Sequence, residues 1–254
     1  MKNSIFIIEN NCERASYLTK ALVKDDYEVA DYPISYNPNK RCIYVFSPAK
    51  KFTAKDYDNI LPSSVVFGGN IINKQAFLDK NCLYFSFMDD KEFVKNNSII
   101  TAEATSKIIT ENTKIAMYNT SILVLGYGNL AKSLQDYLST NAKNIAFASF
   151  EKKELEECPK NFTTFHDKEF CKYLDNFDVI INTIPKILFT QEDYKYFNNQ
   201  PLFIDLASLS CFAQDKIPDN INFIHARNLP SIIAPKTAGE ELKKSLLRFL
   251  RVIQ

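Results

Sequence analysis

The chain has 254 residues, of which 46% are hydrophobic, and its 31 basic and 30 acidic residues give a formal net charge of +1 at pH 7. This length allows one large domain or two modest ones, each with a substantial apolar core. The near balance of charge argues against nucleic-acid and membrane-surface partners, so we predict neither.

The cysteines and histidines do not form a metal-binding pattern. The six cysteines include no C-x-x-C pair, and the chain has only two histidines. We therefore predict no metal site. The apolar run at residues 5–8 is too short for a signal peptide, and no run approaches membrane-spanning length. These features predict a cytoplasmic protein with reduced cysteines.

The first hundred residues alternate short apolar runs with polar segments. Strands are predicted at residues 5–8, 27–30, 42–46, 64–67 and 82–86, and an amphipathic helix is predicted at 14–24. Strands separated by helical segments indicate parallel βαβ units. We predict an N-terminal flavodoxin- or Rossmann-like α/β domain over residues 1–100, and a linking helix within residues 101–120.

A glycine turn follows the apolar run at residues 121–125, and a predicted helix follows the turn. The turn has the pattern G-x-G-x-x-A and comprises Gly126, Tyr127, Gly128, Asn129, Leu130 and Ala131. Gly126 permits the tight turn, Gly128 lets the backbone approach a phosphate, and Ala131 keeps the helix close to the strand. This order places free backbone N–H groups where a pyrophosphate can bind. We predict that the first five of these residues bind a dinucleotide; the alternative is a Rossmann-like turn that binds none.

The second half repeats the alternation of strands and helical segments. It predicts a Rossmann dinucleotide-binding domain over residues 121–235 and a C-terminal amphipathic helix over 236–254. Ligands of doubly wound sheets gather beyond the carboxyl ends of the strands. Further cofactor-binding candidates therefore lie at the carboxyl ends of two predicted strands, residues 177–185 and 201–208: Asn182, Thr183, Ile184, Pro185, Asp205, Ala207 and Ser208. The alternative is that these polar side chains only satisfy their own turns.

The choice between NAD and NADP depends on the end of the predicted strand at residues 144–149. An acidic residue there binds the ribose hydroxyls of NAD, whereas a basic one favours the 2′-phosphate of NADP. Glu151 favours NAD, while Ser149 and Lys152 would accept a phosphate. Both cofactors stay open, with Ser149 and Glu151 as cofactor-binding candidates.

Several motifs occur in the order of a known family. They are Thr101-Ala102-Glu103, the glycine turn, Ile181 to Pro185, Ile204 to Ser208, Leu229-Pro230 and Ala234-Pro235-Lys236-Thr237-Ala238-Gly239. From about residue 95 onward the chain resembles the A subunit of dipicolinate synthase. The resemblance implies a nicotinamide-dependent oxidoreductase of sporulation that oxidises a dihydrodipicolinate-type cyclic dicarboxylate to dipicolinate. It also implies a flavoprotein partner, the B subunit, and leaves a homo-oligomer open.

The resemblance is weaker at several loops that face ligands in this family. The family's Gly-Gly-Asp-x-Arg is replaced by residues 10–14, in which only Arg14 is kept, and its Pro-Gly-Gly is replaced by residues 209–211. These losses favour a non-catalytic dinucleotide-binding scaffold or regulatory subunit for a flavoprotein, whereas the retained Lys236 motif favours the enzyme. A 2-hydroxyacid-type dehydrogenase is a second alternative, but it needs a His–acid pair, and His225 has no evident partner.

The motifs supply the candidates for catalysis, Lys236 and Glu103, and for substrate binding, Arg14, Thr101 and Thr237. Lys236 could hold a carboxylate or donate a proton, or be a surface lysine at a helix start capped by Thr237. Glu103 is either catalytic or a carboxylate that favours a helix N-terminus. Arg14 is either a bidentate carboxylate ligand or an exposed arginine of the first helix.

Overall fold

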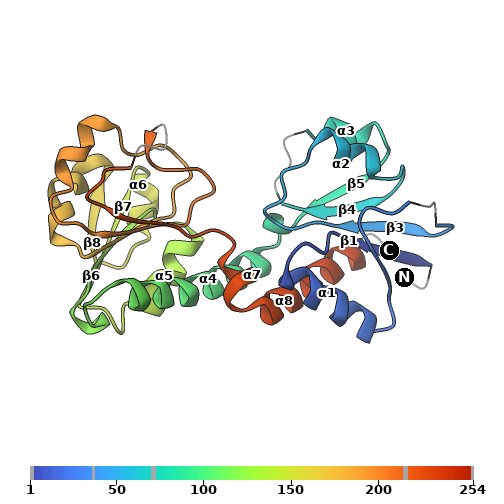
Figure 1. The fold of residues 1–254 in the computed structure, drawn as a ribbon, viewed down its shortest axis with the longest axis horizontal. Helices are drawn as coiled ribbons and strands as arrows, with labels where there is room; N and C mark the ends of the chain where they lie inside the picture. Colours follow the sequence, from blue (N-terminus) through green and yellow to red (C-terminus); the bar gives the residue numbers. More distant parts are fainter. Residues whose placement is uncertain (1–2, 36–37, 70–72, 214–216, 253–254) are drawn as a thin grey trace. The chain divides into compact units, whose positions relative to one another are not determined.

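The computed structural model describes residues 3–35, 38–69, 73–213 and 217–252. The chain forms two compact units, one of Met1–Asn97 with Pro230–Gln254 and one of Ser98–Leu229. Each unit contains one sheet in which all paired strands are parallel (Figure 1). The predicted fold class, two α/β domains, is confirmed. No helix in the described part of the chain is long and apolar enough to cross a membrane.

The first unit has a five-stranded sheet with the order β2-β1-β3-β4-β5. Its strands are β1 (Ser4–Ile8), β2 (Glu28–Asp31), β3 (Arg41–Val45), β4 (Val65–Gly68) and β5 (Leu83–Ser86). This is the strand order of flavodoxin-like sheets, in which the direction of winding reverses between β1 and β3. Each predicted strand of this half is confirmed to within two residues at its ends.

Helices cover both faces of this sheet because alternate residues of a buried strand point to opposite sides. Phe6 and Ile8 pack in one core with residues of α1 (Glu13–Lys24) and α8 (Pro235–Val252). Ile5 and Ile7 pack in the opposite core, beside α2 (Ala54–Asn59) and α3 (Gln75–Leu78). The three central strands, β1, β3 and β4, are therefore buried on both faces, and their apolar residues run on rather than alternate with polar ones.

The C-terminal helix α8 belongs to the first unit and lies alongside α1 (Figure 1). Gly239 permits this close contact. A Cβ atom there would lie 2.7 Å from the carbonyl oxygen of Arg14 and 2.9 Å from the backbone nitrogen of Leu18. One glycine of the Ala-Pro-Lys-Thr-Ala-Gly motif therefore has a packing role between two helices.

The helix α4 (Lys91–Asn112) begins at Lys91, earlier than the predicted start near Thr101. Asp90 precedes it, and its Oδ1 atom accepts hydrogen bonds from the backbone nitrogens of Glu92 and Phe93 at 3.0 and 3.2 Å. Asp90 therefore caps the helix. Glu103 lies in the middle of α4, so the favourable interaction of a carboxylate with a helix N-terminus does not apply to it.

The second unit has a six-stranded sheet with the order β11-β10-β9-β6-β7-β8. Its strands are β6 (Ser121–Leu125), β7 (Asn144–Ser149), β8 (Thr163–His166), β9 (Val179–Asn182), β10 (Leu202–Asp205) and β11 (Asn222–His225). Read from β8, this is the Rossmann order, with the reversal between β6 and β9. The helices of this unit include α5 (Asn129–Leu138) and α6 (Lys152–Glu156). The short helix α7 (Leu229–Ile233) lies almost wholly in the first unit. The 3₁₀ segments of the described residues are η1 (Phe87–Asp89), η2 (Met117–Asn119), η3 (Asp167–Asn176) and η4 (Gln191–Tyr196).

The core on one face of the second sheet is rich in aromatic side chains. Phe203 of β10 packs there with Phe189, Phe197 and Phe212, whose ring centroids lie 5.1 to 6.4 Å from its own. Leu123 and Leu125 of β6 and Ile180 of β9 belong to the same buried cluster. This packing fixes the strands whose carboxyl ends form the candidate site.

Candidate functional site

A cleft lies at the carboxyl ends of β6, β7 and β9, where the strand order of the second sheet reverses. Its volume is about 730 Å³, including space open to solvent. The lining residues all belong to the second unit: Gly126, Tyr127, Gly128, Asn129, Leu130, Ser149, Phe150, Glu151, Glu154, Thr183, Ile184, Pro185 and Lys186. Clefts at this position of doubly wound sheets are the usual ligand sites of the fold.

The first glycine of the turn is required by the backbone. Gly126 has a φ of +100°, and a Cβ atom there would lie 2.4 Å from Thr183 Oγ1. Thr183 Oγ1 itself donates to the carbonyl oxygen of Leu125 at 2.7 Å. The end of β6 is thus held against the end of β9, and only glycine fits between them.

The second glycine leaves room on the cleft side. A Cβ atom at Gly128 would meet nothing within 4 Å. Gly128 is also the N-cap of α5, and the helix has no side-chain cap there. The first N–H groups of α5, beginning at Asn129 and Leu130 of the lining, are therefore suited to an anionic group such as a pyrophosphate.

A carboxylate approaches the glycine turn from α6. Glu154 Oε2 accepts a hydrogen bond from Ser149 Oγ at 2.6 Å and one from the backbone nitrogen of Tyr127 at 3.3 Å. Ser149 Oγ in turn accepts from the backbone nitrogen of Glu151 at 3.1 Å. Glu151 lines the cleft with an exposed side chain, whereas Glu154 holds the hydrogen-bonded position beside the turn.

Ten of the predicted cofactor-binding residues lie together in this cleft: Gly126, Tyr127, Gly128, Asn129, Leu130, Ser149, Glu151, Thr183, Ile184 and Pro185. Four do not line it: Asn182, Asp205, Ala207 and Ser208. The fully buried Asn182 donates from Nδ2 to Asp205 Oδ1 at 2.8 Å and accepts at Oδ1 from the backbone nitrogen of Ile184 at 3.0 Å. Asn182 thus holds the turn at Ile184, and Asp205 holds the side chain of Asn182.

Three lining residues were not among the predicted candidates: Phe150, Glu154 and Lys186. Phe150 and Lys186 directly follow predicted site residues in the sequence, so widening each strand-end segment by one residue would have found them. Glu154 was missed because the ribose-binding acidic residue was expected at the strand end, whereas Glu154 lies in the short helix α6.

The first unit has a smaller hollow of about 280 Å³ at the carboxyl ends of β1 and β3. Arg14 lines it, with only 6% of the residue exposed, so it is not an exposed arginine of the first helix. Its Nε donates to the carbonyl oxygen of Ala238 and its Nη2 to Asn97 Oδ1, both at 3.3 Å. Burial lowers the pKa of Arg14 to about 10, so the guanidinium stays charged at neutral pH.

The other predicted catalytic and substrate-binding residues fall in both units. Lys236 and Thr237 are exposed in the first turn of α8, in the first unit. Thr101 is buried and Glu103 is exposed, and both lie in the part of α4 that belongs to the second unit. A lysine in the first turn of a helix is unfavourable for the helix dipole, so helix stability does not explain Lys236.

The metal and histidine chemistry of the described residues is limited. Among them no group of three or more His, Cys, Asp and Glu side chains is placed to hold a metal ion. His225 is in register with Asp205 on the neighbouring strand, but within the described ranges no hydrogen bond or ion pair joins the two side chains. Asp205 Oδ2 is buried and has no hydrogen-bond partner among these residues.

The two parallel sheets and the glycine-turn cleft define a class, the two-domain α/β proteins that include dehydrogenases. The D-isomer-specific 2-hydroxyacid dehydrogenase of Lactobacillus delbrueckii ssp. bulgaricus, solved in an NAD-complexed form, shares the fold. Its TM-score is 0.56 at 10% identity, covering 98% of this chain and 97% of that one. No family model matches the chain.

Within this class, the chain is similar to the A subunit of dipicolinate synthase. The protein of that name from Bacillus subtilis (strain 168) is 28% identical over 219 residues, which cover 83% of this chain and 73% of the relative. The solved A chain of dipicolinate synthase from Bacillus subtilis has a TM-score of 0.82 at 18% identity, covering 100% of this chain and 97% of that one. The resemblance predicted from the motifs is confirmed.

Proposed function

We propose that this chain is a nicotinamide-dependent oxidoreductase that acts like the A subunit of dipicolinate synthase. It would oxidise a dihydrodipicolinate-type cyclic dicarboxylate to dipicolinate. The observation that carries the proposal is the cleft of the second unit, in which a positive-φ glycine and the uncapped start of α5 lie beside polar side chains of two further strand ends.

The residues of the cleft fit a dinucleotide. The glycine turn would hold the pyrophosphate, Ser149 and Glu154 would face a ribose, and Thr183, Ile184 and Pro185 would border the rest of the cofactor. The bound nicotinamide would accept a hydride from the dihydropyridine-type ring, and the ring would lose a proton as it becomes aromatic.

The candidates for the substrate are Arg14, Lys236 and Thr237 in the first unit and Thr101 and Glu103 in the second. A dicarboxylate needs cationic partners, and Arg14 and Lys236 supply two positive charges on one compact unit. Lys236 or Glu103 would take or supply the proton. The name of the relative, which marks it as one component of a larger enzyme, supports a multi-subunit assembly, and the resemblance supports a flavoprotein as the partner.

One observation favours the alternative of a non-catalytic nucleotide-binding subunit. Arg14 already donates to Ala238 and Asn97, and its guanidinium carbon lies 5.4 Å from the centre of the Phe93 ring. These contacts join α1, α4 and α8 of the first unit, so Arg14 has a structural role that would persist without any substrate.

Two measurements test the proposal. Calorimetric titration with NAD and with NADP should give saturable binding of at least one. Turnover of freshly prepared dihydrodipicolinate, with the flavoprotein partner present, should then reduce the bound cofactor and form dipicolinate. Nucleotide binding without any turnover would support the non-catalytic alternative, and no binding of either nucleotide would refute the cofactor site itself.

A further inference from the structure

We propose that Glu154 makes this chain selective for NAD over NADP. The inference rests on the proposed dinucleotide site and specifies which cofactor it takes. The role assigned to Glu154 is to accept hydrogen bonds from the adenosine ribose hydroxyls and to repel a 2′-phosphate.

The first step is the position of the carboxylate. Glu154 Oε2 lies within hydrogen-bond distance of the backbone nitrogen of Tyr127, which is the residue between the two glycines of the turn. The same oxygen accepts from Ser149, the last residue of β7. In Rossmann sheets the ribose-binding carboxylate comes from the region after this second strand. Glu154 therefore takes that place, although it is carried by the next helix rather than by the strand end.

The second step is the fixed orientation of the carboxylate. Its Oε2 atom is held by two donors, one of them from the turn itself, while Glu154 is only half-buried and lines the cleft. A carboxylate accepts several hydrogen bonds, so Oε1 keeps its capacity for a ribose hydroxyl. The group is preorganised, which limits the entropy lost when the ligand binds.

The third step is the charge around this carboxylate. A 2′-phosphate placed here would adjoin the negative charges of Glu154 and Glu151, both of which line the cleft. The hydroxyl of Ser149, which could otherwise donate to a phosphate, is already used by Glu154. The only lysine of the cleft lining, as far as the structure describes it, is Lys186, which follows β9 and not β7. Like charges at close range oppose NADP, and the opposing group is built into the site.

The test compares NAD and NADP by calorimetric titration of the whole chain and of three variants. The parent should bind NAD at least about tenfold more tightly than NADP. Glu154→Gln should weaken the binding of NAD and strengthen that of NADP. The dissociation constant for NADP divided by that for NAD should therefore fall by about tenfold or more. Glu156→Gln is the matched control, because Glu156 is exposed on the same helix and does not line the cleft. It should leave both affinities unchanged.

Glu151→Gln separates the two acidic residues of the lining, and it should change the ratio much less than Glu154→Gln. Circular dichroism and thermal melting of each variant establish that it is folded. The preference of the parent for NAD over NADP is measured without any variant, so it tests the inference even where a variant does not fold. Equal or tighter binding of NADP by the parent, or a larger change in Glu151→Gln, would overturn the inference while leaving the dinucleotide site intact. Failure of the parent to bind either nucleotide would refute the site and the inference together.

Discussion

Two glycines of the same turn have different physical tasks. Gly126 sits at a positive φ against Thr183, so the fold itself requires it, whereas the space beside Gly128 is open on the cleft side. A substitution at Gly126 strains the backbone, and a substitution at Gly128 is tolerated by the fold but enters the cleft. Substitutions at the two glycines can therefore distinguish an effect on folding from an effect on binding.

We expect Gly128→Val to abolish dinucleotide binding while the protein stays folded. Its φ of −80° suits any residue, and the new side chain would occupy the space of the pyrophosphate. Titration with NAD measures the binding, and thermal melting measures the fold. Gly126→Ala is the contrasting variant and should lower the melting temperature. Binding by Gly128→Val as tight as that of the parent would place the nucleotide elsewhere.

Lys236 is the residue on which the proposed turnover depends most. We expect Lys236→Ala to lower kcat/KM by at least tenfold, which corresponds to about 1.4 kcal/mol, because a charge-assisted contact with a substrate carboxylate or a proton donor is removed. Dinucleotide affinity should stay nearly unchanged, since the cleft belongs to the other compact unit. Lys236→Arg should restore little activity, because a planar guanidinium does not replace a compact ammonium.

The control for Lys236→Ala is Lys24→Ala. Lys24 is also exposed, but it lies in the last turn of its helix, α1, rather than in the first. It should turn over like the parent. Parent-like turnover in Lys236→Ala would reduce Lys236 to a surface residue.

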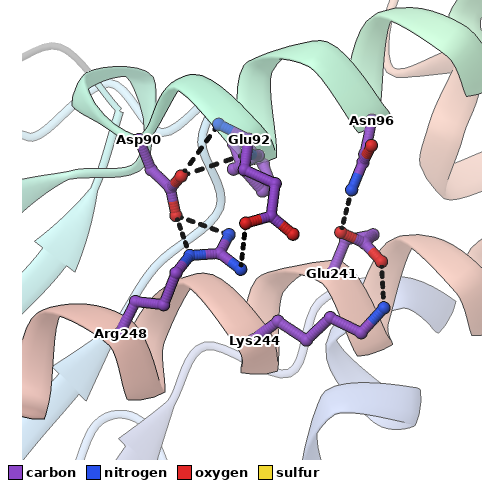
Figure 2. A network of polar contacts seen from close by, with 7 residues as sticks. Asp90, Glu92, Asn96, Glu241, Lys244 and Arg248 are labelled. Atoms are coloured by element: carbon purple, nitrogen blue, oxygen red, sulfur yellow. Dashed lines mark hydrogen bonds and ion pairs between the residues drawn. The ribbon is translucent and has the colours of Figure 1, made fainter.

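At the scale of the elements, ion pairs join the start of α4 to α8 within the first unit (Figure 2). Arg248 donates to Asp90 Oδ2 from Nε at 2.9 Å and from Nη2 at 2.7 Å. Glu241 accepts from Asn96 at 2.7 Å and from Lys244 at 2.6 Å. Burial alone raises the pKa of Asp90, but the hydrogen bonds from Arg248 and from the backbone nitrogen of Phe93, together with the charge of Arg248, outweigh it and lower the pKa. The folded state therefore favours the ionised carboxylate.

This shift predicts how stability depends on pH. A carboxylate with a lowered folded-state pKa stabilises the fold above its unfolded pKa, about 3.9 for Asp, and the contribution is lost as pH falls through the folded value. We expect Asp90→Asn to lower the free energy of unfolding by about 1 to 2 kcal/mol at pH 7, and by progressively less below about pH 4. Asparagine is also a good N-cap, so the change isolates the ion pair with Arg248.

Urea denaturation between pH 3 and pH 7 measures the difference between the parent and Asp90→Asn. Glu111→Gln is the control, since its pair with Lys107 is exposed and 3.7 Å long, and it should cost less than about 0.5 kcal/mol. If Asp90→Asn lowered the free energy of unfolding by the same amount at every pH, the ion pair with Arg248 would not be the cause of the loss.

The elements differ in how well the sequence predicts them. The strands β6 and β7 were predicted at their observed bounds, because each is a short apolar run bordered by polar or glycine residues. The first turns of α4 were missed, because Lys91 to Asn97 is polar apart from Phe93 and Val94 and the helix has little amphipathic character. Its start depends on Asp90. An aspartate before a helix is a local start signal, whereas its ion pair with Arg248, far along the chain, leaves no local pattern.

At the scale of the whole molecule, the sequence predicted two α/β domains but not which core each helix joins. The amphipathic stripe of α8 shows that one face is buried, yet not that α1 of the N-terminal unit buries it. The site also depends on pairing between strands that are far apart in the sequence. Ser149 and Thr183 meet at the cleft only because β6 pairs with both β7 and β9. The strand-end rule found these residues, and it missed Glu154, which reaches the same place from a helix.

Because every lining residue of the cleft belongs to the second unit, nucleotide binding should protect that unit selectively. At a concentration about a hundred times the dissociation constant, a ligand stabilises the binding-competent state by about 2.7 kcal/mol. Hydrogen exchange through openings that destroy the site should therefore slow by about a hundredfold with NAD in peptides that cover β6 to α5, β7 to α6 and the end of β9. Openings confined to the first unit expose no cleft residue, so peptides from β2 and α2 should exchange as before. Gly128→Val supplies the control, because it should show no protection anywhere. Protection concentrated at the ends of β1 and β3 would instead place the nucleotide at the hollow beside Arg14, in the first unit.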